Sequence, residues 1–279
     1  MDNNNLISIV IPCYNDAEFI EQAVDSAINQ THSNKEIIVV DDGSNQDTKL
    51  VLENLEHKID KLITQDNSGQ SNARNNGIKQ AKGKYILVLD SDDYFENSFC
   101  DKAINLFNQS SKVKLVTCYA NLVFKKSTNN FVYKPKGGTV KSFLTSNSAL
   151  GSAMFKKEDW SNCGAYDETM RNGLEDWEFY IRLLKEGGKA EVIEEPLYNY
   201  RKRENTTTSR ANQAKYHLFN YIFTKHKDLN IRHYDDFMSQ LLSKIEKEEH
   251  EKFKNRERIE FKIGESILKP LRWIKAIFR

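Results

Sequence analysis

Four short apolar segments, separated by segments with helical periodicity, constrain the fold of this chain more than any other feature. The apolar segments are Leu6–Ile11, Glu36–Val40, Leu62–Thr64 and Tyr85–Leu89. Short continuous runs rich in β-branched residues are typical of strands buried on both faces of a parallel sheet. The intervening helical segments are Ala17–Asn29, Asp47–Leu55 and Ser71–Ala81. This alternation predicts an α/β fold with a right-handed, doubly wound, mostly parallel sheet flanked by helices.

The rest of the chain divides into two regions that differ in predicted secondary structure and in charge. Lys114–Phe124 and Phe131–Tyr133 are predicted strands, Gly173–Gly187 is a predicted helix, and Ala190–Ile193 and Pro196–Tyr200 close this region. Beyond Thr206 the sequence becomes helical and highly charged. We therefore predict a domain over residues 1–210, with a first part over 1–95 and a second over 96–210. A helical extension over 211–279 follows.

Charge and apolar content exclude several classes of protein. The chain has 279 residues with 41 basic and 40 acidic side chains, so no global field favours nucleic acid. Its four cysteines form no CxxC pair, which favours buried thiols in a reducing compartment. The apolar run Leu6–Pro12 is too short for a secretion signal, and no run approaches the ~20 residues that span a bilayer. We expect a cytoplasmic protein.

Polar segments follow each of the four predicted strands. They are Pro12–Asn15, Asp41–Ser44, Asp66–Gly69 and Asp90–Asp93. In doubly wound sheets, ligands bind in the crevice outside the carboxyl ends of the strands. The sequence therefore predicts one ligand crevice formed by these four loops.

The acidic cluster Asp90–Asp93 is a candidate metal and diphosphate site. Asp90 and Asp92 point the same way if the extended conformation persists, and their charges repel unless a cation compensates. Mg²⁺ or Mn²⁺ would bind such carboxylates and take its remaining ligands from waters and substrate phosphates. Taken alone, the cluster fits an ordinary acidic turn better, with Asp93 as a cap.

Two further loops could contact a nucleotide. Asp42 directly follows a strand and could accept hydrogen bonds from a ribose or a base, although Asp-Gly is also a frequent turn pair. Gly69 allows a tight turn into a helix whose free N–H groups favour anions, and Arg74 lies one turn further on. The alternative is a solvated face of asparagines with Gly77 as a packing contact. No GxGxxG or P-loop sequence is present.

Two later motifs could serve the reaction itself. Glu175 and Asp176 are an acidic pair suited to deprotonating an acceptor hydroxyl, and the neighbouring Trp177 could stack on the acceptor sugar. The alternative is that acidic residues simply favour the first turn of a helix. Arg201 and Arg203 could neutralise a leaving diphosphate, or form an exposed basic loop.

Taken together, these segments resemble the family 2 glycosyltransferases with a GT-A fold. The matching pieces are Ile7–Asn15, Asp41–Ser44, Asn67–Gly77, Gly83–Asp93 and Glu175–Trp177, in the order and spacing of that family over residues 6–209. The resemblance implies an inverting enzyme that uses a metal-bound nucleoside-diphosphate sugar, commonly UDP-linked. It makes residues 1–210 the catalytic domain, with 1–95 as its nucleotide-binding half and 96–210 as its acceptor half. The QxxRW motif and the multi-span membrane domain of processive synthases are not seen.

The resemblance also implies roles for individual residues. Asp92 would bind the metal, Asp176 would be the base with Glu175 beside it, and Trp177 would contact the acceptor. The expected nucleotide-sugar contacts are Pro12, Tyr14, Asn15, Asp42, Asn67, Gly69, Arg74, Asp90, Ser91, Arg201 and Arg203. A histidine that the family sometimes has at position 203 is replaced by arginine, which argues against a metal ligand from that loop.

The segment 252–279 is basic and amphipathic. It holds nine basic and three acidic residues, and Ile263, Ile267, Leu271, Ile274 and Phe278 recur at helical spacing. Such a helix can lie in a membrane interface. A helix packed on the catalytic domain or on a second subunit is an equally good interpretation, which leaves a homo-oligomer open.

The sequence thus favours transfer of one sugar to a glycan or lipid-linked acceptor in surface polysaccharide synthesis, such as a capsule or O-antigen. A sugar nucleotidyltransferase is an alternative, but it needs a glycine-rich triphosphate loop, and Pro12–Asn15 is not one. A catalytically inactive, sugar-nucleotide-binding or scaffold protein is the second alternative. The predicted partners are a UDP-sugar, the acceptor and Mn²⁺ or Mg²⁺, without nucleic acid.

Overall fold

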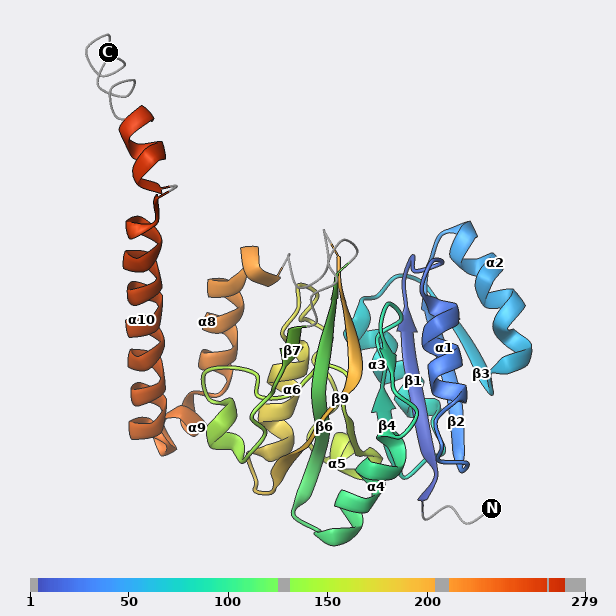
Figure 1. The fold of residues 1–279 in the computed structure, drawn as a ribbon. Coiled ribbons are helices and arrows are strands. Elements are labelled where there is room, and N and C mark those ends of the chain that lie inside the picture. The colour runs from blue at the N-terminus through green and yellow to red at the C-terminus, as the bar shows by residue number, and fades with distance from the viewer. Residues whose placement is uncertain (1–4, 125–130, 204–210, 260, 269–279) are drawn as a thin grey trace. The chain divides into compact units, whose positions relative to one another are not determined.

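The computed structural model describes residues 5–124, 131–203, 211–259 and 261–268. The chain forms two compact units, Met1–Leu229 and Asn230–Arg279 (Figure 1). Within the described residues the first unit contains a nine-stranded sheet with strand order β3-β2-β1-β4-β8-β6-β9-β5, and β7 pairs with β6 at the side. Helices flank this sheet, so the α/β fold class predicted from the sequence is confirmed.

The first four strands are parallel, as expected from their continuous apolar sequences. They are β1 (Ile7–Cys13), β2 (Lys35–Asp42), β3 (Lys61–Gln65) and β4 (Tyr85–Val88). Every residue of β1 and β4 is buried. Their carboxyl ends therefore lie at one edge of the sheet, where the crevice is predicted.

The later strands make the sheet mixed. They are β5 (Tyr94–Phe95), β6 (Val113–Phe124), β7 (Phe131–Tyr133), β8 (Met154–Lys156) and β9 (Lys189–Lys202). β8 runs antiparallel to both β4 and β6 and joins the two halves of the sheet. The two strand segments predicted over 190–200 are one strand: Cys118 pairs with Ile193 and Tyr119 with Pro196, so a bulge absorbs the residues between them.

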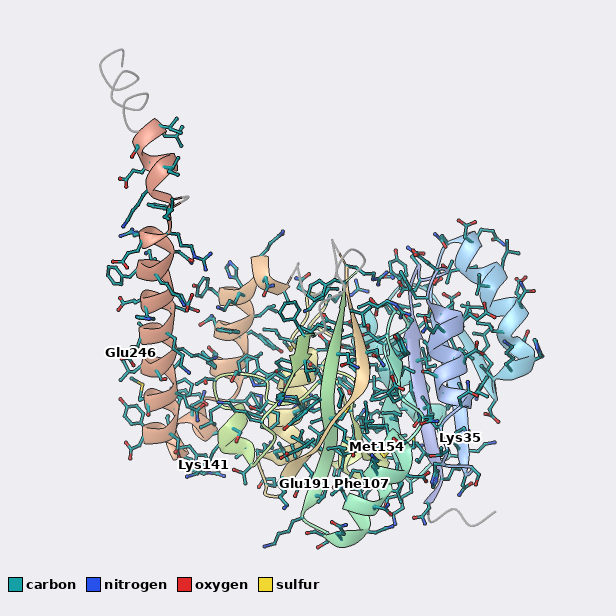
Figure 2. The ribbon with its side chains drawn as sticks, in the orientation of Figure 1. Lys35, Phe107, Lys141, Met154, Glu191 and Glu246 are labelled. Carbon is teal, nitrogen blue, oxygen red and sulfur yellow. The ribbon has the colours of Figure 1, made fainter. Side chains whose placement is uncertain are left out.

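Helices cover both faces of the sheet. The helices are α1 (Ile20–Ile28), α2 (Gln46–Leu55), α3 (Gln70–Gln80), α4 (Phe99–Gln109), α5 (Lys157–Asn162) and α6 (Glu175–Leu184), with short 3-10 turns at Glu56–Lys58 and Val140–Phe143. α1, α2 and α4 share one apolar core with alternate residues of β1, and Met154 and Phe107, labelled in Figure 2, belong to this core. On the other face α3 packs closely, because a Cβ at Gly77 would lie 2.5 Å from Val10 Cγ1.

Further helices follow the last strand of the sheet in the chain. α8 (Lys215–Lys225) belongs to the first unit, where Phe219 packs edge-on against Trp177 of α6 with ring centroids 5.4 Å apart. The first unit therefore extends past the boundary predicted at residue 210. α9 (Lys227–Arg232) crosses between the units, and the second unit contains α10 (Tyr234–Glu257) and helical residues 261–268. Among the described residues no helix is long and apolar enough to span a membrane.

Candidate active site

The loops that follow the parallel strands meet at the edge of the sheet, as the sequence predicts. The backbone N–H of Asn15 donates to Ser44 Oγ at 3.1 Å, which joins the loops after β1 and β2. Ser91 Oγ donates to Asp16 Oδ2 at 2.6 Å, which joins the loops after β4 and β1. Beside this junction, Pro12 is buried at the end of β1 and Tyr14 is half exposed.

Asp42 organises the turn that leads into α3. Its carboxylate accepts hydrogen bonds from the backbone N–H groups of Ser68 at 2.7 Å and Gly69 at 2.9 Å, while Asn67 donates to its backbone carbonyl. Gly69 adopts φ +89°, a conformation that favours glycine. Both carboxylate oxygens of Asp42 are thus engaged within the protein, and a nucleotide would have to share them.

Arg74 is the bridge between the two halves of the site. Its Nη2 lies 2.7 Å from Asp90 Oδ1, and its Nη1 lies 2.5 Å from Glu175 Oε1. The residue is only 2% exposed. Burial disfavours the charged guanidinium, but the carboxylates of Asp90 and Glu175 outweigh it and raise the pKa of Arg74. Arg74, predicted as a nucleotide contact, therefore holds the aspartate after β4 against the beginning of α6.

Asp176 lies in a pocket of about 370 Å³ that Arg74, Asp90 and Glu175 also line. Burial, reinforced by the charge of Glu175, raises the pKa of Asp176 to about 7. Asn147 Nδ2 donates to Asp176 Oδ2 at 2.7 Å and orients the carboxylate. A carboxylate with a pKa near neutrality, placed in a cleft, suits a general base.

The residues of the acidic cluster have different environments. Asp92 pairs with Arg203, whose guanidinium also lies 3.0 Å from Asp16 Oδ1. Burial, followed by the charge of Asp90, raises the pKa of Asp92 to about 6, although Arg203 opposes this. Asp93 is fully buried, and burial raises its pKa well above the usual value.

Asp93 has a structural role. Its carboxylate accepts hydrogen bonds from the Tyr198 hydroxyl at 2.6 Å and from the backbone N–H of Arg201 at 2.7 Å. These two bonds attach the loop after β4 to β9.

The donor set at the acidic cluster fits a hard cation that a substrate helps to hold. Asp92 and Asp90 provide carboxylate oxygens whose mutual repulsion a divalent cation would relieve. No cluster of three or more His, Cys, Asp or Glu side chains able to hold a metal occurs in the described ranges. The residues present therefore fit a metal whose ligands come partly from the protein and partly from a bound diphosphate. They do not form a complete set of metal ligands by themselves.

Arg201 of β9 and Arg203, just past the end of this strand, lie beside the acidic cluster. The Arg201 guanidinium lies 5.0 Å from the ring centroid of Phe19 and 4.8 Å from that of Tyr94, and it donates to the backbone carbonyl of Asp92. Arg203 lies 4.7 Å from the same Phe19 ring. Both predicted diphosphate contacts are thus near Asp92, in a cationic patch held by aromatic rings.

The predicted acceptor contact at Trp177 is wrong in this structure. Trp177 is 1% exposed, its Nε1 donates to the backbone carbonyl of Phe143 at 2.6 Å, and Phe219 and Phe223 pack against its ring. Helical periodicity explains the difference, because Trp177 follows Asp176 by one position and so points about 100° away from it. Its ring fixes α8 on α6 and offers no face to a sugar.

Among the residues that sequence reasoning missed, Tyr133, Gly151 and Lys202 line the pocket, and Asn147 binds the carboxylate of Asp176. A Cβ at Gly151 would lie 3.2 Å from Asp176 Oδ2, so this glycine leaves room for the carboxylate. Of these residues, only Lys202 could have been suggested by the sequence, because it lies between Arg201 and Arg203. Tyr133, Asn147 and Gly151 reach the site from segments that are distant along the chain, and no sequence pattern marks them.

With this geometry in place, comparison with known proteins is informative. Residues 8–160 match the family described as Glycosyl transferase family 2. The chain is also 30% identical over 211 residues to the putative teichuronic acid biosynthesis glycosyltransferase TuaG of Bacillus subtilis, covering 73% of this chain and 82% of TuaG. The chain belongs to glycosyl transferase family 2. This family membership sets aside the nucleotidyltransferase alternative.

Solved structures share the fold of this glycosyltransferase. TarS 1-349 of S. aureus, in complex with UDP-GlcNAc, superimposes with a TM-score of 0.61 at 20% identity, over 73% of this chain and 60% of TarS 1-349. The mannosyltransferase PcManGT of Pyrobaculum calidifontis, in complex with GDP-Man and Mn2+, gives a TM-score of 0.58 at 16% identity, over 74% of this chain and 61% of PcManGT. The glycosyltransferase therefore has a GT-A-like fold and spans about three fifths of these two proteins.

Proposed function

We propose that the protein transfers one sugar, with inversion, from a nucleoside-diphosphate sugar to a glycan or lipid-linked acceptor in surface polysaccharide synthesis. The observation that carries this proposal is the pocket in which Asp176, with its raised pKa, lies beside the Arg74–Asp90 pair. The proposed base, Asp176, is thus adjacent to Asp90, at the end of the proposed nucleotide crevice. The resemblance to TuaG supports the choice of product class.

The donor is proposed to lie across the loops after β1, β2, β3 and β4. Pro12, Tyr14, Asn15, Asp42, Asn67 and Gly69 would surround the nucleoside, with Asp90 and Ser91 towards the ribose and Arg201 and Arg203 towards the diphosphate. UDP is the proposed nucleotide, since a TarS structure of the same fold was solved with UDP-GlcNAc.

Asp92 is the proposed ligand of Mn²⁺ or Mg²⁺. A divalent cation there would neutralise charge on the leaving diphosphate. PcManGT, a neighbour in fold, was solved with Mn2+, which supports this choice.

Asp176 is proposed to remove the proton from the acceptor hydroxyl as it attacks the sugar. Asn147 orients its carboxylate, and burial, followed by the charge of Glu175, raises its pKa towards neutrality, where a base is most effective. Because Glu175 is 3% exposed and bound to Arg74, it positions this region and does not itself accept the proton.

Thermal denaturation with UDP and Mn²⁺ tests the donor site. UDP should raise the melting temperature more with Mn²⁺ than without it, and Asp92→Ala should abolish that difference. Glu53→Ala, which removes an exposed carboxylate from α2, is the matched control and should leave the difference intact. An equal effect of Mn²⁺ in the Asp92→Ala variant would contradict the site. A screen of nucleotide sugars for turnover then identifies the donor.

We further propose a cytoplasmic enzyme whose segment 252–279 contacts the inner face of the membrane. Phe253, Phe261, Ile263 and Ile267 expose about half or more of their surface, on a segment rich in basic residues. Residues 260 and 269–279 of this segment lie outside the described residues. The full chain should sediment with vesicles that contain phosphatidylglycerol and not with pure phosphatidylcholine, and Phe261→Ser with Ile267→Ser should reduce sedimentation. Loss of a dimer in these variants, without vesicle binding by the parent, would favour the subunit-packing alternative.

A further inference from the structure

The pocket around Asp176 has an aromatic floor formed by the second half of the sheet. Ala120 of β6 pairs with Tyr133 of β7 on one side and with Tyr198 of β9 on the other. Side chains at directly paired positions lie on the same face of a sheet. All three residues line the pocket: Ala120 and Tyr198 are buried, and Tyr133 is 41% exposed.

Further residues of β9 also line the pocket, and the last of them is the cationic Lys202. Leu122 pairs with Tyr200, and both residues line the pocket together with Lys202. Because side chains alternate along a strand, Tyr200 and Lys202 face the pocket while Arg201 and Arg203 face Asp92. The Lys202 ammonium lies 4.3 Å from the centroid of the Tyr200 ring, which holds it at the pocket wall.

Lys202 differs from Arg201 and Arg203 in its electrostatic contacts. It makes no ion pair with any residue that the structure describes, although Arg201 and Arg203 beside it both contact Asp92. Partial burial lowers the pKa of Lys202, and only the charge of Asp93 opposes this effect. A bound anion would stabilise the charged ammonium, and carboxylates and phosphates are the anions that lysine binds.

We propose that Tyr133, Tyr200 and Lys202 form the acceptor subsite, and that Lys202 binds an anionic group, a carboxylate or a phosphate, on the acceptor sugar. This inference rests on the proposed function. It assigns the acceptor to this face of β9 because the donor diphosphate is assigned to the opposite face, with Arg201 and Arg203. Tyr133 and the proposed base Asp176 line the same pocket, and burial, followed by the charge of Asp176, raises the pKa of Tyr133.

Ligand-observed NMR with the full chain, saturated with UDP and Mn²⁺, tests the subsite. The probes are methyl β-glucuronide, glucose 6-phosphate and methyl β-glucoside. At least one anionic probe should bind about tenfold more tightly than the glucoside, as expected for one charge-assisted contact. The two anionic probes distinguish a carboxylate from a phosphate. Lys202→Gln should remove the preference, whereas Lys112→Gln, at an exposed lysine outside the pocket, should retain it. Tyr200→Leu should weaken all three probes.

The inference is overturned if the parent binds the three probes alike or if Lys202→Gln keeps the preference. It is also overturned if Lys202→Gln weakens UDP binding as much as probe binding, because the lysine would then serve the donor. The rise in melting temperature with UDP and Mn²⁺, measured on the same samples, reports on the proposed function separately. Failure of the donor site is therefore distinguishable from failure of the acceptor subsite.

Discussion

The guanidinium of Arg74 lies 2.5 Å from the carboxylate of Glu175, a residue 101 positions further along the chain. The same guanidinium binds Asp90 at 2.7 Å. One side chain thus joins the loop that ends β4 to the helix that carries Asp176. Because both halves of the proposed reaction depend on this junction, its variants are the sharpest tests of the site.

Arg74→Lys should damage the junction although the positive charge is retained. A lysine ammonium cannot reproduce the two-pronged geometry of the guanidinium, so Asp90 or Glu175 loses its partner. Leaving a buried charge unpaired costs roughly 3–5 kcal/mol, so the free energy of unfolding should fall by an amount in or below that range. Urea denaturation measures it. Unchanged stability would show that the bridge is not formed in solution.

Glu175→Gln should separate positioning from proton transfer. The amide keeps the shape of the side chain but removes the charge that helps to raise the pKa of Asp176. The acid limb of the kcat/KM profile should therefore move to lower pH, with turnover retained at high pH. Glu186→Gln, at an exposed glutamate beyond α6, is the control and should not move the limb. Complete loss of turnover at every pH would instead make Glu175 the base.

Asp176→Asn should lower the transfer rate by about 100-fold or more while donor affinity is retained, since general bases contribute rate enhancements of that order. The parent should lose activity as the pH falls through about 7, the raised pKa of Asp176. Retained turnover in Asp176→Asn would refute the role.

The same variant should be more stable than the parent at pH 8. The pKa of Asp176 is about 7 in the folded chain and 3.8 ordinarily. Between these values the folded state binds the proton and the unfolded state does not, so Asp176 destabilises the fold as the pH rises. The melting temperature of Asp176→Asn should exceed that of the parent at pH 8 and approach it at pH 4. Equal melting temperatures at pH 8 would mean that Asp176 is not buried as described.

Arg203→Gln should strengthen the response to metal alone. The guanidinium neutralises Asp92 and Asp16, and the amide leaves both carboxylates uncompensated. Mn²⁺ without nucleotide should therefore raise the melting temperature of Arg203→Gln more than that of the parent. Arg232→Gln, at an exposed arginine in α9, should respond like the parent. A smaller response in Arg203→Gln would place the metal elsewhere.

Trp177→Ala should act on stability and not on acceptor binding. Truncating a buried tryptophan costs roughly 3–5 kcal/mol, and the Phe143 carbonyl also loses its donor. Trp177→Phe should be milder and leave the KM for acceptor unchanged. A raised acceptor KM in Trp177→Phe, with stability intact, would restore the role first expected from the sequence.

The sequence predicted the elements that depend on local pattern. The parallel strands and α1–α3 follow from apolar runs and periodicity, and the meeting of the strand-end loops follows from the direction of those strands. Residues such as Asp92 and Asp176 could be selected because acidic side chains at the ends of strands or helices are locally conspicuous.

The contacts made by those residues could not be predicted in the same way. That Arg74 binds Glu175, or that Asn147 orients Asp176, depends on packing between distant segments, and no periodicity encodes it. Trp177 was misassigned because an aromatic next to a base suggests a ligand contact, whereas the turn of α6 directs it into the core. The floor of the pocket needs the pairing of β6 with β9, two strands about 70 residues apart.

The alternation along the end of β9 separates two sets of side chains, one that lines the pocket and one that contacts Asp92. Single substitutions at Tyr200 or Lys202 can alter what is recognised on one side and leave Arg201 and Arg203 undisturbed on the other. Acceptor choice could therefore diversify between relatives while the donor machinery stays constant. A one-residue insertion in this strand would do the opposite, because it would exchange the two sets of side chains and disrupt both sets of contacts at once.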